Sequence, residues 1–492
     1  MTKVERSAFR HIMKGTAVFG GTQLLTMMAN IVKGKFVAMI LSDYGMGVSS
    51  LMQSALMPMQ QLFSFGLPTA GVKDIAAETD PQRKAQMVLT FRRLLYSLAM
   101  LGSIVMAASA SLFSISTFGD DSHTWWFVEM SVALLFFILA TGENTILQGY
   151  RRLKSLATCN IMSALCGLLC STPLYYFYGI EGIVPAMIVL SVTMFCFTRY
   201  STSRISIHPQ PQSWRSTFLQ AKGLLVLGGV MMVSGFIGTA TTYFINTFIR
   251  KYGSIPDVGL FQAANIITLQ ATALIFTAMG TDYYPSLSAV VNKREDVKTL
   301  VEHEGEIVVL IMAPITILLI LFAPAIVSIL LTPAFNAIVP LLRLIAIGFI
   351  GRAFCFPLDY VCMAYGDKTF FFWTQGIWSN LQKFILYVCG YYFWGLIGLG
   401  YAVVLSAVID IALSVVLIQR RYRVHYSVTM LHTLLPLLIA NVVALAASYI
   451  SHSFISNGIM AVCALVTCVF SYRQLDKRVG FKDLLLQIRK RV

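Results

Sequence analysis

Apolar stretches of about twenty residues recur along almost the whole chain, separated by short segments that carry most of its charge. The chain is 57% apolar and only 12% charged. A soluble domain carries roughly a quarter charged residues and has no means of hiding so much apolar surface. A bilayer does, because each helix that crosses its hydrocarbon core needs about 20 apolar residues. The sequence therefore predicts an all-α integral membrane protein with about 14 transmembrane helices.

The predicted spans follow from these apolar stretches and the segments between them. By residue number, we place them at 15–41, 47–68, 94–114, 125–148, 157–178, 181–200, 223–249, 258–281, 306–331, 337–363, 369–392, 395–418, 431–450 and 454–472. The first apolar stretch runs on to Leu41, which is too long for a cleaved signal peptide. We therefore expect the first span to be retained.

The basic residues lie almost entirely on one side of this predicted topology. Thirty of the 37 Lys and Arg residues fall in segments on the side of the two termini, whereas only Arg250 and Lys251 fall on the other side. Cytoplasmic segments of membrane proteins are enriched in this way. We expect both termini in the cytoplasm and the chain in the inner membrane. The net charge of +15 then reflects orientation in a membrane, and no nucleic-acid partner is expected.

Several functional classes find no support in the sequence. The nine cysteines lie within apolar spans without a C-x-x-C pair, and the seven histidines lack ligand spacing, so we expect neither a metal nor a cofactor. The loops are too short for a soluble catalytic domain. A membrane-embedded polymerase or ligase would need a sizeable outer loop, and residues 120–123 form the one acidic outer cluster, interpreted as a solvated turn. We do not expect an enzyme.

Two segments indicate an internal duplication. Residues 42–53 and 254–265 align with Gly47 on Gly259, an offset of 212 residues that corresponds to six spans. An even number of spans makes the halves parallel repeats, which suits alternating access. We therefore predict an N-terminal lobe, a C-terminal lobe, and two last helices with a basic cytoplasmic tail, at residues 1–222, 223–425 and 426–492.

Several phrases resemble those of a known family. They read Lys33-Gly-Lys-Phe-Val-Ala, Tyr44-Gly-Met-Gly-Val-Ser-Ser-Leu-Met-Gln, Met279-Gly-Thr-Asp-Tyr-Tyr-Pro-Ser-Leu-Ser-Ala-Val and Phe356-Pro-Leu-Asp-Tyr. Together they resemble Wzx-type flippases of lipid-linked oligosaccharides, in the polysaccharide transporter family of the multidrug/oligosaccharidyl-lipid/polysaccharide (MOP) exporter superfamily. The resemblance implies two six-helix lobes plus two helices. Two positions depart from the family pattern, because Asp359 stands in place of a glycine and Gln375 in place of a glutamate.

The resemblance also implies a cargo and partners. The cargo would be an undecaprenyl-pyrophosphate-linked oligosaccharide, the repeat unit of an O-antigen, capsule or exopolysaccharide, moved from the cytoplasmic to the periplasmic leaflet. The partners would then be this glycan and membrane lipids, and a polysaccharide polymerase is a further candidate.

Charged residues inside the predicted spans are the candidates for function, because each costs about 2.5–3.5 kcal/mol to insert. Four cations are expected to bind the pyrophosphate through charge-assisted hydrogen bonds, namely Lys33, Lys35, Arg352 and Lys383. The acids Asp410, Asp359 and Asp282 are candidates for ion coupling or gating.

Structural roles remain open for several of these residues. Lys383 can pair with Asp410, and Arg352 shares a helix face with Asp359. Lys33 and Lys35 would serve one cavity only if the first span bends, which the glycine between them permits. Arg343 lies close enough to the outer surface to snorkel. Asp282 and Glu143, near inner span ends, are undecided between gating and capping.

A second function from the same superfamily remains an alternative, that of an H⁺- or Na⁺-coupled multidrug antiporter. Such a protein needs acids that hold the ion and a cationic drug. Among the charged residues singled out inside the spans, the five cations Lys33, Lys35, Arg343, Arg352 and Lys383 outnumber the two acids Asp359 and Asp410, and this excess favours an anionic cargo.

Overall fold

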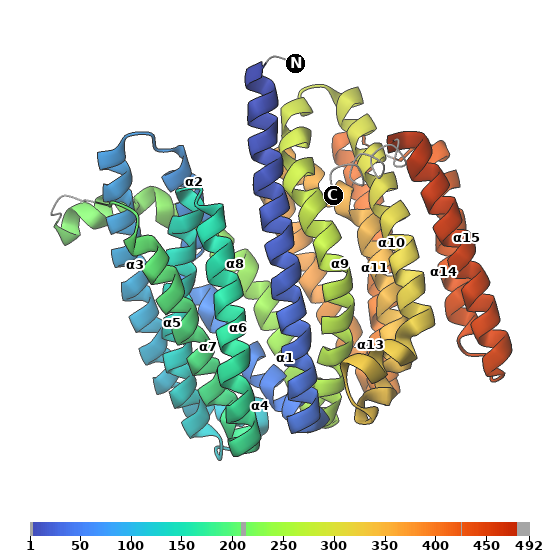
Figure 1. The fold of residues 1–492 in the computed structure, drawn as a ribbon, viewed down its shortest axis with the longest axis horizontal. Coiled ribbons are helices and arrows are strands. Elements are labelled where there is room, and N and C mark those ends of the chain that lie inside the picture. The colour runs from blue at the N-terminus through green and yellow to red at the C-terminus, as the bar shows by residue number, and fades with distance from the viewer. Residues whose placement is uncertain (1–2, 208–212, 425, 480–492) are drawn as a thin grey trace. The chain divides into compact units, whose positions relative to one another are not determined.

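The computed structural model describes residues 3–207, 213–424 and 426–479, with side chains of the first helix described from Thr26 onward (Figure 1). This part of the chain is helical throughout and holds no strand. Contacts divide the chain into two compact units, Met1–Gly259 and Leu260–Val492. Each unit is described by itself, and the lobe boundaries expected from the sequence stay a prediction.

The first unit is built on long helices joined by short turns. Their bounds are α1 (Lys3–Ser64), α2 (Leu67–Ala77), α3 (Pro81–Ala108), α4 (Ala110–Phe118), α5 (Thr124–Gly149), α6 (Leu153–Tyr178), the 3₁₀ turn η1 (Gly179–Gly182), α7 (Ile183–Ser203) and α8 (Trp214–Tyr252). The backbone of α1 is broken at Ser42, where φ is 58°. The first arm of α1 contains the predicted span 15–41, and the second contains most of 47–68, whose last residues lie beyond Ser64.

The second unit continues the pattern. Helix α9 (Ile255–Val290) begins at the end of the first unit, and the remaining elements are α10 (Arg294–Leu330), η2 (Pro333–Ile338), α11 (Val339–Ala364), α12 (Lys368–Phe371), the π-helix η3 (Phe372–Trp378), α13 (Ser379–Tyr422), α14 (Val428–Ala447) and α15 (Ser453–Val479). Helix α13 is broken at Gly395, where φ is 58°. A glycine adopts this left-handed conformation without steric cost.

Eight helical stretches in the described residues are long and apolar enough to cross a membrane. Two of them, 153–203 and 368–422, hold 51 and 55 residues and contain the positive-φ glycines Gly179 and Gly395. At about 1.5 Å per residue, each is long enough to cross a hydrocarbon core of about 30 Å twice. Most predicted spans lie largely on one helix or on one arm of a broken helix, but 94–114 crosses the junction of α3 and α4, and 369–392 runs through α12, η3 and the start of α13. The chain is thus a multi-pass membrane protein, whereas the number fourteen remains a prediction.

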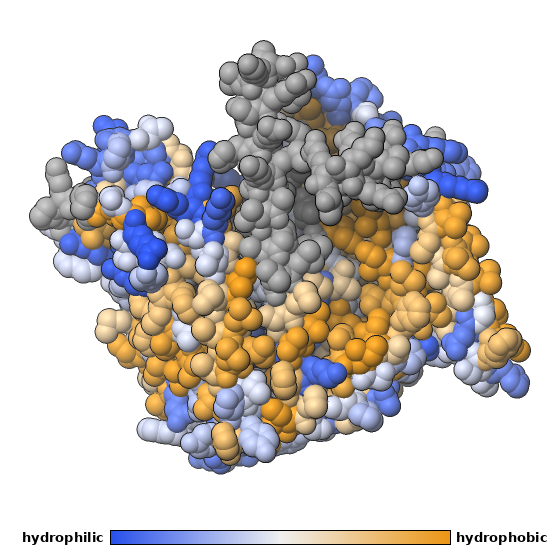
Figure 2. Space-filling view, viewed as in Figure 1, coloured by the Kyte–Doolittle hydropathy of each residue, from blue (hydrophilic) through white to orange (hydrophobic). Residues whose placement is uncertain are grey.

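The surface agrees with a bilayer environment. On the face shown in Figure 2, apolar residues cover the middle of the helices and hydrophilic residues gather near their ends. In the second unit, α14 and α15 expose a band of large apolar side chains, namely Leu435, Leu438, Ile439, Val442, Val462, Leu465, Val466 and Val469. In water such a band would be an aggregation site, so its natural environment is lipid.

The two segments with a repeated sequence contact each other within the first unit. A Cβ atom on Gly47 would lie 2.1 Å from the carbonyl oxygen of Ile255, and one on Gly259 would lie 2.2 Å from that of Asp43. The contact is reciprocal under the 212-residue offset, since 255 − 43 and 259 − 47 both equal 212. A two-fold relation produces reciprocal contacts of this kind. Only glycine fits at either position.

Candidate functional site

Two of the predicted acids and one predicted cation lie together in the second unit, between α11 and α13. Asp359 on α11 accepts a hydrogen bond from the Gln375 amide at 2.8 Å and a longer one from the Ser414 hydroxyl at 3.4 Å. Gln375 belongs to the π-helix, whose wider turn is a local departure often found at functional sites. The two departures from the family pattern are therefore in direct contact.

Asp410 lies on the second arm of α13 and Lys383 on the first. Asp410 is within 3.5 Å of the Ser406 hydroxyl, and the Gln382 amide donates to the Ser406 carbonyl oxygen at 3.2 Å, which links the two arms. Lys383 and Asp410 are the pair that the sequence suggests could form an ion pair. Among the described side chains, however, no N–O distance within 4.0 Å joins them. The direct ion pair considered from the sequence is absent in this conformation.

Arg352 projects from α11 and is exposed. Its guanidinium carbon lies 5.4 Å from the ring centre of Phe276 and 5.9 Å from that of Phe349, which is within cation–π range. In the described part of the chain it makes no ion pair, with Asp359 or with any other acid. The predicted Arg352 cation is thus held by aromatic faces and keeps its hydrogen-bond donors for another partner.

Lys33 and Lys35 lie on the first arm of α1. Lys33 is half-buried and Lys35 is exposed, and a Cβ on Gly34 would meet nothing within 4 Å. The helix is broken at Ser42 alone, so its backbone stays helical at Gly34. On a regular helix, side chains two positions apart in the sequence point about 200° apart around the helix axis. The bend that would turn both lysines to one side is not present.

Two further charged residues considered from the sequence are Arg343 and Asp282. The Arg343 guanidinium donates to the carbonyl oxygens of Ile320 at 3.1 Å and Ser448 at 3.4 Å, so it links α11 to the interior of α10 and to the end of α14. Asp282 lies in α9, but its side chain is outside the described part of the chain. Whether Asp282 gates the cavity or caps the helix therefore stays open.

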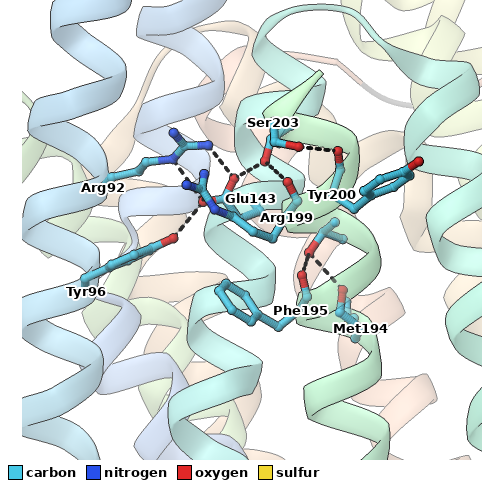
Figure 3. Close-up of polar contacts among 10 residues, drawn as sticks. Arg92, Tyr96, Glu143, Met194, Phe195, Arg199, Tyr200 and Ser203 are labelled. Atoms are coloured by element: carbon cyan, nitrogen blue, oxygen red, sulfur yellow. Dashed lines mark hydrogen bonds and ion pairs between the residues drawn. The ribbon is translucent and has the colours of Figure 1, made fainter. Parts of the chain in front are cut away.

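A cluster that the sequence did not reveal lies in the first unit and is centred on Glu143 (Figure 3). The Glu143 side chain on α5 is fully buried and forms an ion pair with Arg92 of α3, with an Nη2–Oε2 distance of 2.6 Å. Arg199 of α7 approaches the same carboxylate at 3.6 Å. From the sequence, Arg92 and Arg199 are only two of the charges that orient the chain, and the role of Glu143 is open.

The Glu143 carboxylate is saturated with hydrogen bonds. Its Oε1 accepts from Arg92 Nε at 2.9 Å and from the Tyr96 hydroxyl at 2.7 Å. Its Oε2 accepts from Arg92 Nη2 and from the Thr202 hydroxyl. A carboxylate offers about four lone-pair sites, and four donors fill them. Three helices, α3, α5 and α7, thus meet on one buried charge.

Comparisons with known proteins now bear on this architecture. The family model described as "Polysaccharide biosynthesis protein" matches residues 36–340. A search of curated proteins found no match.

Among similar solved structures, the lipid II flippase MurJ in an inward closed conformation is 14% identical, with a TM-score of 0.71, covering 94% of this chain and 99% of that chain. An inward-facing multidrug resistance MATE family transporter of the MOP superfamily is 16% identical, with a TM-score of 0.67, covering 82% and 98%. A MOP superfamily transporter from Pyrococcus furiosus is 14% identical, with a TM-score of 0.60, covering 82% and 96%. At these identities the likeness shows the fold alone.

Proposed function

Because the chain belongs to the polysaccharide biosynthesis protein family, we propose that it flips an undecaprenyl-pyrophosphate-linked oligosaccharide from the cytoplasmic to the periplasmic leaflet of the inner membrane. The oligosaccharide would be the repeat unit of an O-antigen, capsule or exopolysaccharide, and the protein would work by alternating access. A polysaccharide polymerase that receives the flipped repeat unit is a candidate partner. The fold shared with a lipid II flippase supports the proposal.

The observation that carries the proposal is the state of Arg352. It is a cation within a predicted span, exposed, held by two aromatic rings and without an ion-paired acid among the described side chains. A charge at membrane depth is costly unless a partner or water receives it. An arginine fork matches a phosphate group through two parallel hydrogen bonds. We therefore assign Arg352 to the pyrophosphate. Lys33, Lys35 and Lys383 remain candidate cargo-binding cations, and the straight helix at Gly34 lets only one of Lys33 and Lys35 face any one cavity.

The acids in the second unit suit a coupling role. Asp359 and Asp410 receive hydrogen bonds from Gln375, Ser414 and Ser406, and Lys383 interacts with both electrostatically. A proton or cation taken up here would change the charge that Lys383 experiences. We propose this cluster as the place where ion binding and cargo binding communicate, with Asp282 as a further candidate for gating.

The alternative function, a multidrug antiporter, has one specific observation in its favour. A MATE family transporter shares the fold over 82% of this chain. That reading requires a cationic drug to be stable near Arg352 and Lys383 of the second unit, where like charges repel. The flippase proposal avoids this conflict because its cargo is an anion.

The test is reconstitution of the full chain into liposomes with an undecaprenyl-pyrophosphate-linked disaccharide as the probe. We expect Arg352→Gln to lower the translocation rate at least about tenfold, since a charge-assisted hydrogen bond contributes about 1.5–3 kcal/mol. Lys251→Gln, which removes an exposed cation outside the predicted spans, serves as the matched control and should leave the rate unchanged.

Wild-type-like translocation by Arg352→Gln would remove that residue from the cargo site. Failure of the wild-type chain to move the probe, together with efflux of a cationic drug, would establish the antiporter instead.

A further inference from the structure

We propose that Arg199 anchors an anion-binding site at the end of α7, and that the site takes a phosphate group carried on a lipid. The site is separate from the Arg352 region, since Arg199 belongs to the first unit and Arg352 to the second. The inference has two candidate ligands, the proposed cargo and a membrane phospholipid. Only the first of these rests on the proposed function. Its evidence is the hydrogen-bond inventory of the Glu143 cluster (Figure 3).

Arg199 lies close to Glu143 but forms no hydrogen bond with it. The four lone-pair sites of the carboxylate are taken by Arg92, Tyr96 and Thr202, and Arg199 stands at 3.6 Å, beyond hydrogen-bond distance. In the described part of the chain, the Arg199 side chain donates no hydrogen bond. A guanidinium carries five N–H donors, and those of Arg199 that point away from Glu143 are available to a second anion.

The net charge of the cluster also favours binding of an anion. Two arginines meet one buried carboxylate, and this leaves the group with one net positive charge. The Arg92 side chain is 20% exposed, whereas that of Arg199 is 46% exposed, so the surplus charge is accessible at Arg199. The Glu143 carboxylate attracts the Arg199 guanidinium to this helix end before a ligand binds, and preorganisation of this kind lowers the entropic cost of binding.

The position of the cluster selects a ligand at the membrane surface. Arg199 lies four residues from the end of α7, about 6 Å along the helix, and Glu143 lies six residues from the end of α5, about 9 Å. These ends are the ones that the basic-residue pattern assigns to the cytoplasm. Lipid phosphates lie at this depth, and a planar guanidinium binds phosphate oxygens in a bidentate manner.

Two lipids carry the required group, namely the pyrophosphate-bearing cargo and an anionic phospholipid of the inner leaflet. The experiment separates them. The full chain is released from phosphatidylcholine nanodiscs and bound lipids are counted by native mass spectrometry, with undecaprenyl pyrophosphate titrated in one arm and phosphatidylglycerol in the other. Unfolding temperature is recorded in parallel for every variant.

We expect Arg199→Ala to weaken binding of one of the two probes about tenfold, equivalent to about 1.4 kcal/mol. Arg199→Lys keeps the charge but loses the fork, so its loss should be smaller. The matched control is Arg204→Ala, which removes an exposed arginine at the same helix end that stacks 4.5 Å over Tyr200. Its binding should stay within about twofold of the wild type. Unfolding temperature should not change with Arg199→Ala, because the four hydrogen bonds of Glu143 remain.

Each result has one meaning. Weaker binding of undecaprenyl pyrophosphate assigns the site to the cargo, and weaker binding of phosphatidylglycerol assigns it to a phospholipid. Unchanged binding of both probes overturns the inference, as does a fall in unfolding temperature that accounts for the lost binding. If Arg199-dependent binding is present but the wild-type chain translocates no lipid-linked oligosaccharide, the proposed function fails and this site stands.

Discussion

Replacing Glu143 with glutamine tests whether the buried cluster holds the inner ends of α3, α5 and α7 together. The substitution keeps the shape of the side chain and removes its charge. One carboxylate oxygen becomes an NH₂ group that faces donors of Arg92, Tyr96 or Thr202, so at least one hydrogen bond is lost and Arg92 is left without its counter-ion.

The magnitude follows from the burial of the partners. Removing one member of a buried ion pair costs about 3–5 kcal/mol. Arg92 and Arg199 are 20% and 46% exposed, so water relieves part of this penalty and about 2–4 kcal/mol remains. Opening at these helix ends should then become about 30- to 1,000-fold more frequent, since 1.36 kcal/mol corresponds to a factor of ten.

Hydrogen exchange measured by mass spectrometry reads this opening directly, because exchange reports local opening free energies. We expect faster exchange in peptides that cover 140–149 and 196–203. The matched control is Glu181→Gln, the same change at an exposed glutamate in η1. Protection in Glu143→Gln equal to that of the wild type would show that the cluster does not hold these helices.

Two further predictions concern close contacts. Gly47→Ala should destabilise the first unit by about 1–3 kcal/mol in thermal unfolding because its Cβ would meet a carbonyl oxygen at 2.1 Å. Gly34→Ala, where the space is open and the backbone helical, should be neutral or stabilising, and equal effects of the two changes would contradict the packing argument. Gln375→Glu would place a second carboxylate beside Asp359, and because like charges repel, the translocation rate should fall about tenfold. The double variant Asp359→Asn/Gln375→Glu keeps one carboxylate at this contact and should restore much of the translocation rate. Equal loss in the single and double variants would refute a role for the charge at this contact.

The sequence alone was sufficient for the class of protein and the positions of its helices. The hydropathy of a span depends only on about twenty consecutive residues. A helix in lipid also satisfies its backbone hydrogen bonds within the same consecutive residues. Most of the predicted spans therefore lie largely on single helices or on the arms of the broken α1 and α13, although 94–114 crosses the junction of α3 and α4. The family resemblance likewise came from short contiguous phrases, and the family model bears it out over 36–340.

Only the tertiary structure decided which charged side chains meet. Arg92 and Thr202 lie 51 and 59 residues from Glu143, and nothing in the local sequence around any of them encodes that encounter. In the same way, the sequence allows Lys383 to pair with Asp410, but the packing of the two arms of α13 leaves them without a direct ion pair. The rotation and packing of helices fix such contacts at the scale of a few ångströms, whereas hydropathy fixes only how far along each helix a residue lies.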